Sequence, residues 1–270
     1  PRMAAGEAIG CFGLTEPDHG SDPASMRTRA RKDGDDWVLN GSKMWITNGS
    51  IADVAVVWAN AGEEHGGIRG FVVPTDTSGF AAHKISHKMS LRASVTAELT
   101  FEDLRLPADA VFPDVTGLKG PLACLSEARY GIVWGALGAA RSSLDAARRY
   151  SMGRIQFGRP IAGFQLTQAK LANMATELQL GQLLALHLGR RKDTVGLRPE
   201  QVSVGKYNNI TKAIEICRTA RTILGANGVS GEYPVLRHAN NLESVLTYEG
   251  TVEMHTLVIG QALTGESAFR

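Results

Sequence analysis

The sequence has few of the residues that mark disulfide-bonded, zinc-binding or membrane proteins. Its 270 residues contain three cysteines, Cys11, Cys124 and Cys217, which lie far apart. Because their number is odd and their spacing is wide, they predict reduced core thiols of an intracellular protein, not a disulfide framework or a zinc site. No apolar run approaches the roughly 18–20 residues that a membrane-spanning helix requires, so no membrane partner is expected.

Neither sign of charge dominates. The chain has 29 lysines and arginines against 27 acidic residues, a net charge of +2. This balance provides no steering field for nucleic acid, and none is expected as a partner. The composition, 43% hydrophobic and 21% charged, is that of an ordinary globular protein long enough to bury a sizeable core.

Several widespread functional motifs are absent. The sequence has no GxSxG elbow, no Walker loop and no GxGxxG after a strand. These absences argue against an α/β-hydrolase, a P-loop nucleotidase and a Rossmann-type dinucleotide-binding protein. His83 and His87 are four residues apart, but their segment does not look helical and no further ligands accompany them. A surface pair is therefore favoured over a metal site.

The chain divides into two halves with different hydrophobic periods. Residues 9–116 contain short runs rich in Val, Ile, Thr and aromatic residues, separated by turn residues, which predict a β-sandwich or barrel domain. Within it, the Asn40-Gly41 pair in "LNGSK" predicts a hairpin turn. Residues 1–8 read as the end of a helix, and we expect them to close a helical domain that precedes this chain.

Residues 117–270 have a helical period and predict a C-terminal four-helix-bundle domain, so the fold class is α+β. Further helices are expected at about 199–224, 235–245 and 252–262, with Pro199 at a helix start and Thr251 as an N-cap. Two sets of small and apolar residues repeat at steps of three and four, each along one helix face: Val133, Leu137, Ala140, Leu144 and Ala147; and Leu171, Met174, Leu178, Gly181, Ala185 and Leu188.

Three stretches could bind a ligand or be purely structural, and a fourth, "ILGANG", is interpreted as structural. "CFGLTEPDHGSD" could present backbone N–H groups to a polar ring, or be a turn that closes a strand. Trp45 and Thr47 in "KMWITNG" share a strand face that could stack on a heterocycle, or simply pack. "GRIQFGRPIAGFQ" could grip a dinucleotide or fix a helix–helix turn, and "ILGANG" ends a helix with glycine.

Taken together and in this order, these stretches resemble the acyl-CoA dehydrogenase family of flavoproteins. The resemblance rests on "GLTEP…GSD", "WITNG", R-x-x-F-G-x-P followed by Gln, "LG-x-NG" and "YEGT", which span nearly the whole chain. Within the family, "SLRASVTAELTFEDLRLP", "CLSEARYGIVWGALGAA" and "RHANNLESVLTYEGT…H" are most similar to glutaryl-CoA dehydrogenases.

The resemblance implies an FAD cofactor and a set of residues that bind it. Phe12, Leu14 and Thr15 would bind the pyrimidine edge of the flavin, and Ser21 would lie near the phosphates of FAD or of the CoA substrate. Trp45 and Ile46 would lie along the ring system, with Thr47 near flavin N5. The ADP half, in this family bound by a neighbouring subunit, would contact Arg154, Phe157, Gln165, Leu224, Gly225 and Gly228, and the residues bordering the cofactor would be Thr251 and Glu253.

Glu249 matches the catalytic base of the family. It is the only charged residue between Glu243 and Glu253, and burial beside apolar residues would raise its pKa toward that of a poised base. The alternative is a solvated acid beside a helix. Some relatives carry the base at the position of Ala128; Glu127, one residue away, should point elsewhere. The substrate would contact Ser21, Leu122, Leu125, Arg129, Tyr248 and Gly250.

The resemblance implies oxidative decarboxylation of glutaryl-CoA to crotonyl-CoA and CO2, in lysine and tryptophan degradation. An electron-transferring flavoprotein would accept the electrons, and the protein would form a homotetramer. It would lie in the cytoplasm of a bacterium or in the mitochondrial matrix. Three alternatives stay open: a short-chain acyl-CoA dehydrogenase without decarboxylation, an oxidase that uses O₂, and a non-catalytic flavin-binding or assembly module.

Three features depart from the family pattern. His19 stands where a small residue is usual, and Ala226 replaces a common glycine. Ala226 is tolerable at a negative φ and costly at a positive one. The family's first helical domain, which in the glutaryl subgroup brings the arginine for the distal carboxylate of the substrate, has no counterpart in the sequence.

Overall fold

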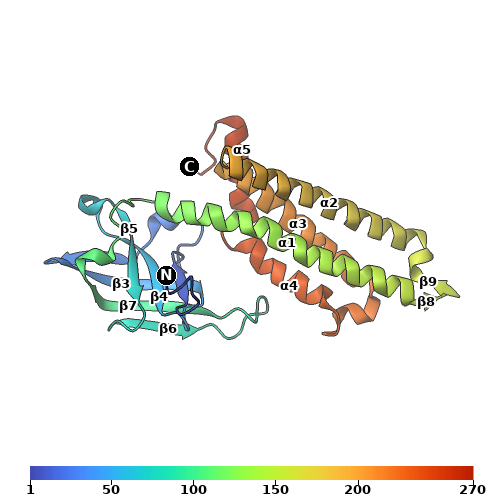
Figure 1. Cartoon of the computed structure of the whole chain (residues 1–270), viewed down its shortest axis with the longest axis horizontal. Helices are drawn as coiled ribbons and strands as arrows, with labels where there is room; N and C mark the ends of the chain where they lie inside the picture. Colours follow the sequence, from blue (N-terminus) through green and yellow to red (C-terminus); the bar gives the residue numbers. More distant parts are fainter. Residues whose placement is uncertain (270) are drawn as a thin grey trace. The chain divides into compact units, whose positions relative to one another are not determined.

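The computed structural model describes residues 1–269. The chain forms two compact units, Pro1–Cys124 and a second that begins at Leu125 (Figure 1). The first unit contains a β-sheet and the second contains helices, which confirms the α+β fold class. Each unit is described by itself below.

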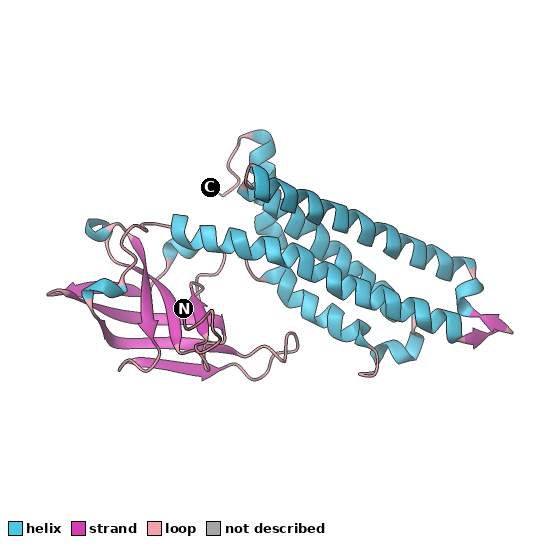
Figure 2. Cartoon of the chain, viewed as in Figure 1, coloured by secondary structure: helices cyan, strands magenta, loops and turns pink. Residues whose placement is uncertain are grey.

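The first unit contains a β-sheet, drawn in magenta in Figure 2. The sheet has seven strands in the order β1-β4-β2-β3-β7-β6, and β5 pairs with β4. β1 runs parallel to β4, whereas β3, β7 and β6 are antiparallel neighbours. The strands are β1 (Gly10–Gly13), β2 (Arg29–Asp33), β3 (Asp36–Thr47), β4 (Val54–Asn60), β5 (Ile68–Pro74), β6 (Phe80–Lys84) and β7 (Thr96–Leu106).

The predicted hairpin turn at Asn40-Gly41 is wrong. Both residues lie inside β3, where the pairing with β7 shifts register between Leu39 and Gly41. The turn lies earlier, at Gly34 and the next residue, between β2 and β3. Gly41 is needed for another reason, because a Cβ there would lie 2.6 Å from the Cα of Thr28. The Asn-Gly pair therefore marks a close backbone approach beside a bulge.

The second unit contains five helices within the described residues: α1 (Lys119–Gly153), whose first turns belong to the first unit, α2 (Gln165–Thr194), α3 (Pro199–Ile223), α4 (Pro234–Thr247) and α5 (Val252–Thr264). The small and apolar sets expected on two of them are almost wholly buried, with Leu144 and Leu171 partly so. Pro199 opens α3, and the hydroxyl of Thr251 caps α5 by accepting a hydrogen bond from the Met254 amide at 3.3 Å. Both start signals are confirmed.

One of the three cysteines departs from prediction. Cys11 and Cys217 are buried, and burial raises the pKa of each thiol to about 11, so they are unreactive core residues. Cys124 is exposed, because it lies on the open side of the first turns of α1.

Residues 1–269 contain neither a candidate membrane span nor a candidate metal cluster. No helix in this range is long and apolar enough to cross a membrane. In the same range, no group of three or more His, Cys, Asp or Glu residues could hold a metal ion. His83 lies on β6 and His87 follows it, both exposed.

Candidate active site

Glu249 lies in the short connection between α4 and α5, in a backbone conformation that few residues adopt. Its φ is +53°, in the left-handed region, and the φ of Gly250 is +98°. The side chain is half-buried, and its Oε2 atom is buried without a hydrogen-bond partner among residues 1–269. A strained backbone and an unpartnered carboxylate oxygen are typical of a functional group, not of a solvated acid.

Two cations hold the backbone on both sides of this carboxylate. Arg129, on α1, donates from Nε to the carbonyl oxygen of Glu249 at 2.7 Å. Lys206, on α3, donates from Nζ to the carbonyls of Tyr248 and Gly250, each at 2.7 Å. Three successive carbonyl groups therefore converge on two cations, while the Oε2 atom of the carboxylate has no hydrogen-bond partner among the described residues.

Burial and the two nearby cations shift the pKa of Glu249 in opposite directions. Burial raises the pKa of Glu249, because water no longer solvates the carboxylate, and the charges of Arg129 and Lys206 oppose this rise. Burial also raises the pKa of the neighbouring Tyr248. The net direction for Glu249 is upward, which suits a general base working near neutral pH.

His255, on α5, packs under the loop. Its Nδ1 lies 3.0 Å from the hydroxyl of Ser203, while its Nε2 is buried without a hydrogen-bond partner in the described range. Burial and the two nearby cations lower the pKa of His255 to about 4, so the imidazole is neutral at neutral pH. A neutral ring adds no further positive charge beside Glu249.

We expect Gly250→Ala to destabilise the protein by about 3 kcal/mol, from backbone strain and overpacking together. An added Cβ would lie 2.9 Å from Nε2 of His255, at a φ that side chains disfavour. Urea unfolding measures the loss. Gly231→Ala is the matched control, because no atom lies within 4 Å of its added Cβ. Equal stability of the two variants would contradict the prediction.

The sequence reasoning missed Lys206, Ser203 and His255. A signal for Lys206 was present, because it falls on the buried face of α3 with Val202 and Ile210, one turn away on either side. A lysine on an apolar stripe needs a partner, and here the partners are main-chain carbonyls. The expectation for Glu127 is confirmed: it points away and pairs with Lys192 at 2.6 Å.

In the first unit, the segment after β1 is anchored by a buried ion pair. Lys43, on β3, is wholly buried and donates to Glu16 Oε1 at 2.8 Å and to the carbonyl of Leu14 at 3.1 Å. Although burial lowers the pKa of Lys43 to about 8, it remains protonated at neutral pH. The amides of Arg27 and Thr28 also donate to Glu16. Sequence reasoning placed Glu16 in the loop but missed Lys43.

The flavin-binding residues predicted in this unit are partly accessible. The side chains of Leu14 and Ile46 lie in the core, so only their backbone groups are available to a ligand. Phe12 and Thr15 are half-buried, and Ser21 is exposed. Trp45 is 60% exposed at a φ of +63°, and Thr47 is exposed beside it. An exposed tryptophan in a strained conformation does not fit the interpretation that it simply packs.

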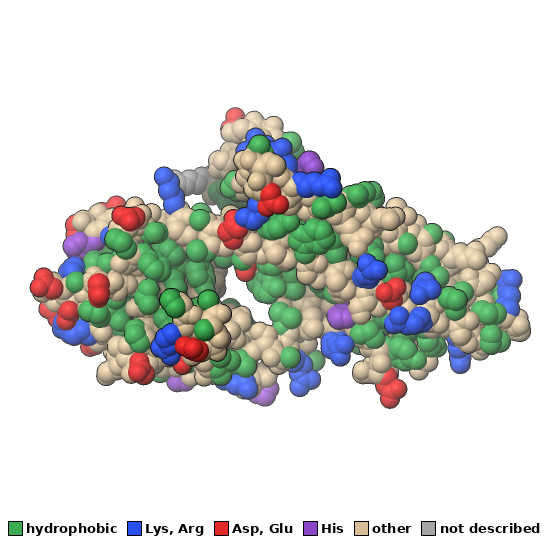
Figure 3. Space-filling model, viewed as in Figure 1, with side chains coloured by type: hydrophobic (Ala, Val, Ile, Leu, Met, Phe, Trp, Pro, Cys, Tyr) green, Lys and Arg blue, Asp and Glu red, His purple; other side chains and the backbone are tan. Residues whose placement is uncertain are grey.

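The connection between α1 and α2 also exposes an aromatic residue in a strained backbone conformation. Two short strands, β8 (Ile155–Gln156) and β9 (Arg159–Pro160), form a hairpin whose turn consists of Phe157 and Gly158, with φ values of +52° and +79°. Phe157 is 95% exposed, and Arg154 and Gln165 are exposed on either side of the hairpin. Figure 3 shows hydrophobic side chains on the surface of the helical unit.

The loop after α3 requires glycine at two positions for structural reasons. Gly225 has a φ of +59°, and a Cβ at Gly228 would lie 2.3 Å from the carbonyl oxygen of Arg221. Leu224 is buried, so only its backbone could reach a ligand. Ala226 does not have a positive φ, which explains why it can replace glycine.

The remaining predicted residues occupy accessible positions. Leu122 is exposed and Leu125 half-buried on α1, and Glu253 is exposed in the first turn of α5, where Thr251 caps the helix. The ligand-binding roles of all these residues stay predictions. Of the six non-glycine residues with positive φ in the described chain, three are predicted site residues: Trp45, Phe157 and Glu249. Such strain concentrates where function requires it.

Comparison with known proteins defines the class. The acyl-CoA dehydrogenase middle-domain model matches residues 11–104, and the C-terminal-domain model matches residues 116–264. The chain belongs to the acyl-CoA dehydrogenase family, whose members are FAD enzymes.

Individual relatives agree with this assignment. A glutaryl-CoA dehydrogenase structure from Mycobacterium smegmatis is 69% identical with a TM-score of 0.98, covering 100% of this chain and 69% of that one. A second structure from that organism, in complex with FADH2, is 64% identical with the same TM-score and coverage. The human mitochondrial short-chain specific acyl-CoA dehydrogenase is 39% identical over 95% of this chain, which spans 63% of that relative.

Proposed function

We propose that the protein is an FAD-dependent acyl-CoA dehydrogenase that converts glutaryl-CoA to crotonyl-CoA and CO2. The observation that carries the proposal is Glu249, a half-buried carboxylate with a raised pKa, which is held in place through its backbone and whose buried Oε2 atom has no hydrogen-bond partner among residues 1–269. Such a group can remove the weakly acidic α-proton of a thioester. The similarity to two glutaryl-CoA dehydrogenase structures supports the substrate.

The residues present fit an FAD. Trp45 offers an exposed aromatic face next to the Thr47 hydroxyl, and Phe157 offers a second exposed ring beside Arg154. These are the contacts that a flat heterocycle and a dinucleotide phosphate require. Bound FAD would accept the β-hydride of the substrate.

The chain's own residues would handle the α-proton. Glu249 would take it at a carboxylate oxygen, and Arg129 and Lys206 would limit the cost of the charge on Glu249 before transfer. Any side chain at position 250 would crowd His255, because an added Cβ would lie 2.9 Å from its Nε2 atom. We further propose an electron-transferring flavoprotein as the electron acceptor and a homotetramer as the assembly.

Anaerobic bleaching of the flavin absorbance tests the proposed function. We expect the FAD-loaded protein to lose its oxidised flavin band with glutaryl-CoA and to release CO2. Bleaching by butyryl-CoA alone would keep the chemistry and overturn the substrate. With FAD bound, absence of bleaching by either thioester would contradict a catalytic role and leave a flavin-binding module.

The second candidate is a short-chain acyl-CoA dehydrogenase that does not decarboxylate its product. The 39% identity to the human short-chain specific enzyme favours it. It requires the same base and the same hydride acceptor, so the two are distinguished by the thioester that bleaches the flavin and by the release of CO2. Reoxidation of the reduced protein in air tests the oxidase alternative, which requires rapid recovery of the flavin band.

A further inference from the structure

Lys206 is a buried cation of the helical unit that has no bonded carboxylate among residues 1–269. It is 1% exposed, and its two hydrogen bonds within this range go to main-chain groups and not to an acid. Burying an ammonium group is costly unless strong acceptors surround it. Both acceptors here are main-chain carbonyls, one on each side of Glu249.

The conformation of the loop explains where these carbonyls point. Glu249 is in the left-handed region and Gly250 has a φ of +98°, and the carbonyls of residues 248 and 250 both bond Lys206 Nζ at 2.7 Å. A left-handed conformation is unfavourable for a residue other than glycine, so the surrounding structure must impose it. The two charge-assisted hydrogen bonds of Lys206 can supply that free energy.

We propose that Lys206 is the positioning residue of Glu249: its ammonium group fixes the strained loop through the carbonyls of Tyr248 and Gly250 and leaves the carboxylate free to act as a base. This inference rests on the proposed function. Arg129, on α1, bonds only the carbonyl of Glu249 itself. Lys206 bonds the carbonyls of the residues before and after Glu249.

A direct ion pair with the carboxylate would work against the reaction. A cation bonded to Glu249 would lower its pKa and occupy the oxygen that must receive the proton. Donating to the carbonyls instead keeps the positive charge close while the Oε2 atom stays unpartnered. The titratable groups that face Glu249 are Arg129 from α1, Lys206 from α3, His255 from α5 and the adjacent Tyr248.

Lys206→Met in the FAD-loaded protein tests the proposal. We expect flavin reduction to slow by about 10- to 100-fold, because a small displacement of a base has an effect of this size. The acid limb of the pH–rate profile should move to higher pH, since loss of a nearby cation raises the pKa of Glu249. Amide hydrogen exchange of residues 247–252 should become faster, a result that does not depend on turnover.

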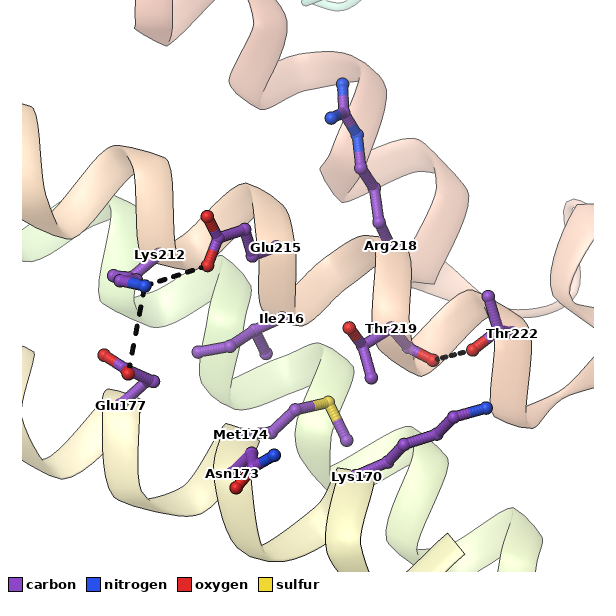
Figure 4. A pocket seen from close by; sticks show the side chains of 10 residues that line it. All are labelled: Lys170, Asn173, Met174, Glu177, Lys212, Glu215, Ile216, Arg218, Thr219 and Thr222. Atoms are coloured by element: carbon purple, nitrogen blue, oxygen red, sulfur yellow. Dashed lines mark hydrogen bonds and ion pairs between the residues drawn. The ribbon is translucent and has the colours of Figure 1, made fainter. Parts of the chain in front are cut away.

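Lys212→Met is the matched control. Lys212 lies on α3 in a surface groove, between Glu177 on α2 and Glu215 (Figure 4). Neither Glu249 nor Lys206 lines this groove. The control variant should keep the rate, the acid limb and the exchange of residues 247–252. Lys206→Arg restores the charge and should return the acid limb toward its original position even where the rate stays low.

Unchanged reduction rate and an unmoved acid limb in Lys206→Met would overturn the proposal. If that variant does not fold, Lys206→Gln, which keeps one donor, must show the same shift of the acid limb. If neither acyl-CoA thioester bleaches the flavin of the unsubstituted protein, the proposed function fails. Amide exchange then still decides whether Lys206 holds the loop.

Discussion

Replacing Glu249 with glutamine is expected to slow flavin reduction by on the order of 10³-fold while FAD remains bound, because the amide cannot accept the α-proton. Glutamine has nearly the same shape, so the strained loop and the hydrogen bond from Arg129 to its carbonyl should persist. The rate of anaerobic bleaching measures the effect, and the flavin content of the purified variant shows that binding is intact.

Glu243→Gln is the matched control for Glu249→Gln. Glu243 is an exposed acid of α4, six residues earlier, that pairs with Arg218, and its loss should leave the rate unchanged. Equal loss in both variants would indicate a general effect of removing charge from this segment. Retained bleaching in Glu249→Gln would remove Glu249 from the role of base.

The pH dependence of the unsubstituted protein follows from the same residue. Burial raises the pKa of Glu249 above its ordinary value of 4.5, so the carboxylate that accepts the proton forms only at higher pH. The rate should therefore rise with pH through this raised pKa. Glu249→Gln should lack that limb in its residual activity.

Lys43→Met is expected to reduce the free energy of unfolding by about 3–5 kcal/mol, because it leaves Glu16 buried without its counter-charge. Urea unfolding of the FAD-loaded protein measures the loss. Flavin affinity should fall as well, because Lys43 also holds the Leu14 carbonyl of the predicted flavin loop. Lys84→Met, an exposed lysine at the end of β6, is the control and should change stability little.

Two further results separate this explanation from a simple loss of packing. The double variant Lys43→Met with Glu16→Gln removes both charges, so it should be more stable than Lys43→Met alone. A double variant that is less stable than the single one would contradict the role assigned to the pair.

The loss of stability at acid pH should reveal the contribution of the Lys43–Glu16 ion pair. Burial alone would raise the pKa of Glu16, but hydrogen bonds from Lys43 and from the amides of Thr28 and Arg27 lower it to about 2. A depressed folded-state pKa stabilises the protein above the ordinary value of 4.5 and loses that contribution as pH falls toward 2, by roughly 3 kcal/mol. This acid-dependent loss should be much smaller in Lys43→Met.

Much of the helical unit could be predicted because helix signals are local. The apolar sets on α1 and α2, Pro199 at the start of α3 and the Thr251 cap of α5 each depend on residues within one or two turns. The sheet was harder. Asn40-Gly41 resembles a turn in isolation, but long-range pairing of β3 with β7 extends the strand through it.

Family membership and the choice of Glu249 as the candidate base could be predicted from the sequence, since both depend on short motifs in a fixed order. The surroundings of that base depend on the tertiary structure. Lys206, His255 and Arg129 are separated from Glu249 by 43, 6 and 120 residues, respectively, and the distances between their atoms depend on how four elements pack. Burial and the cations near the carboxylate together set its pKa. Both are properties of the packed bundle that residue order alone does not contain.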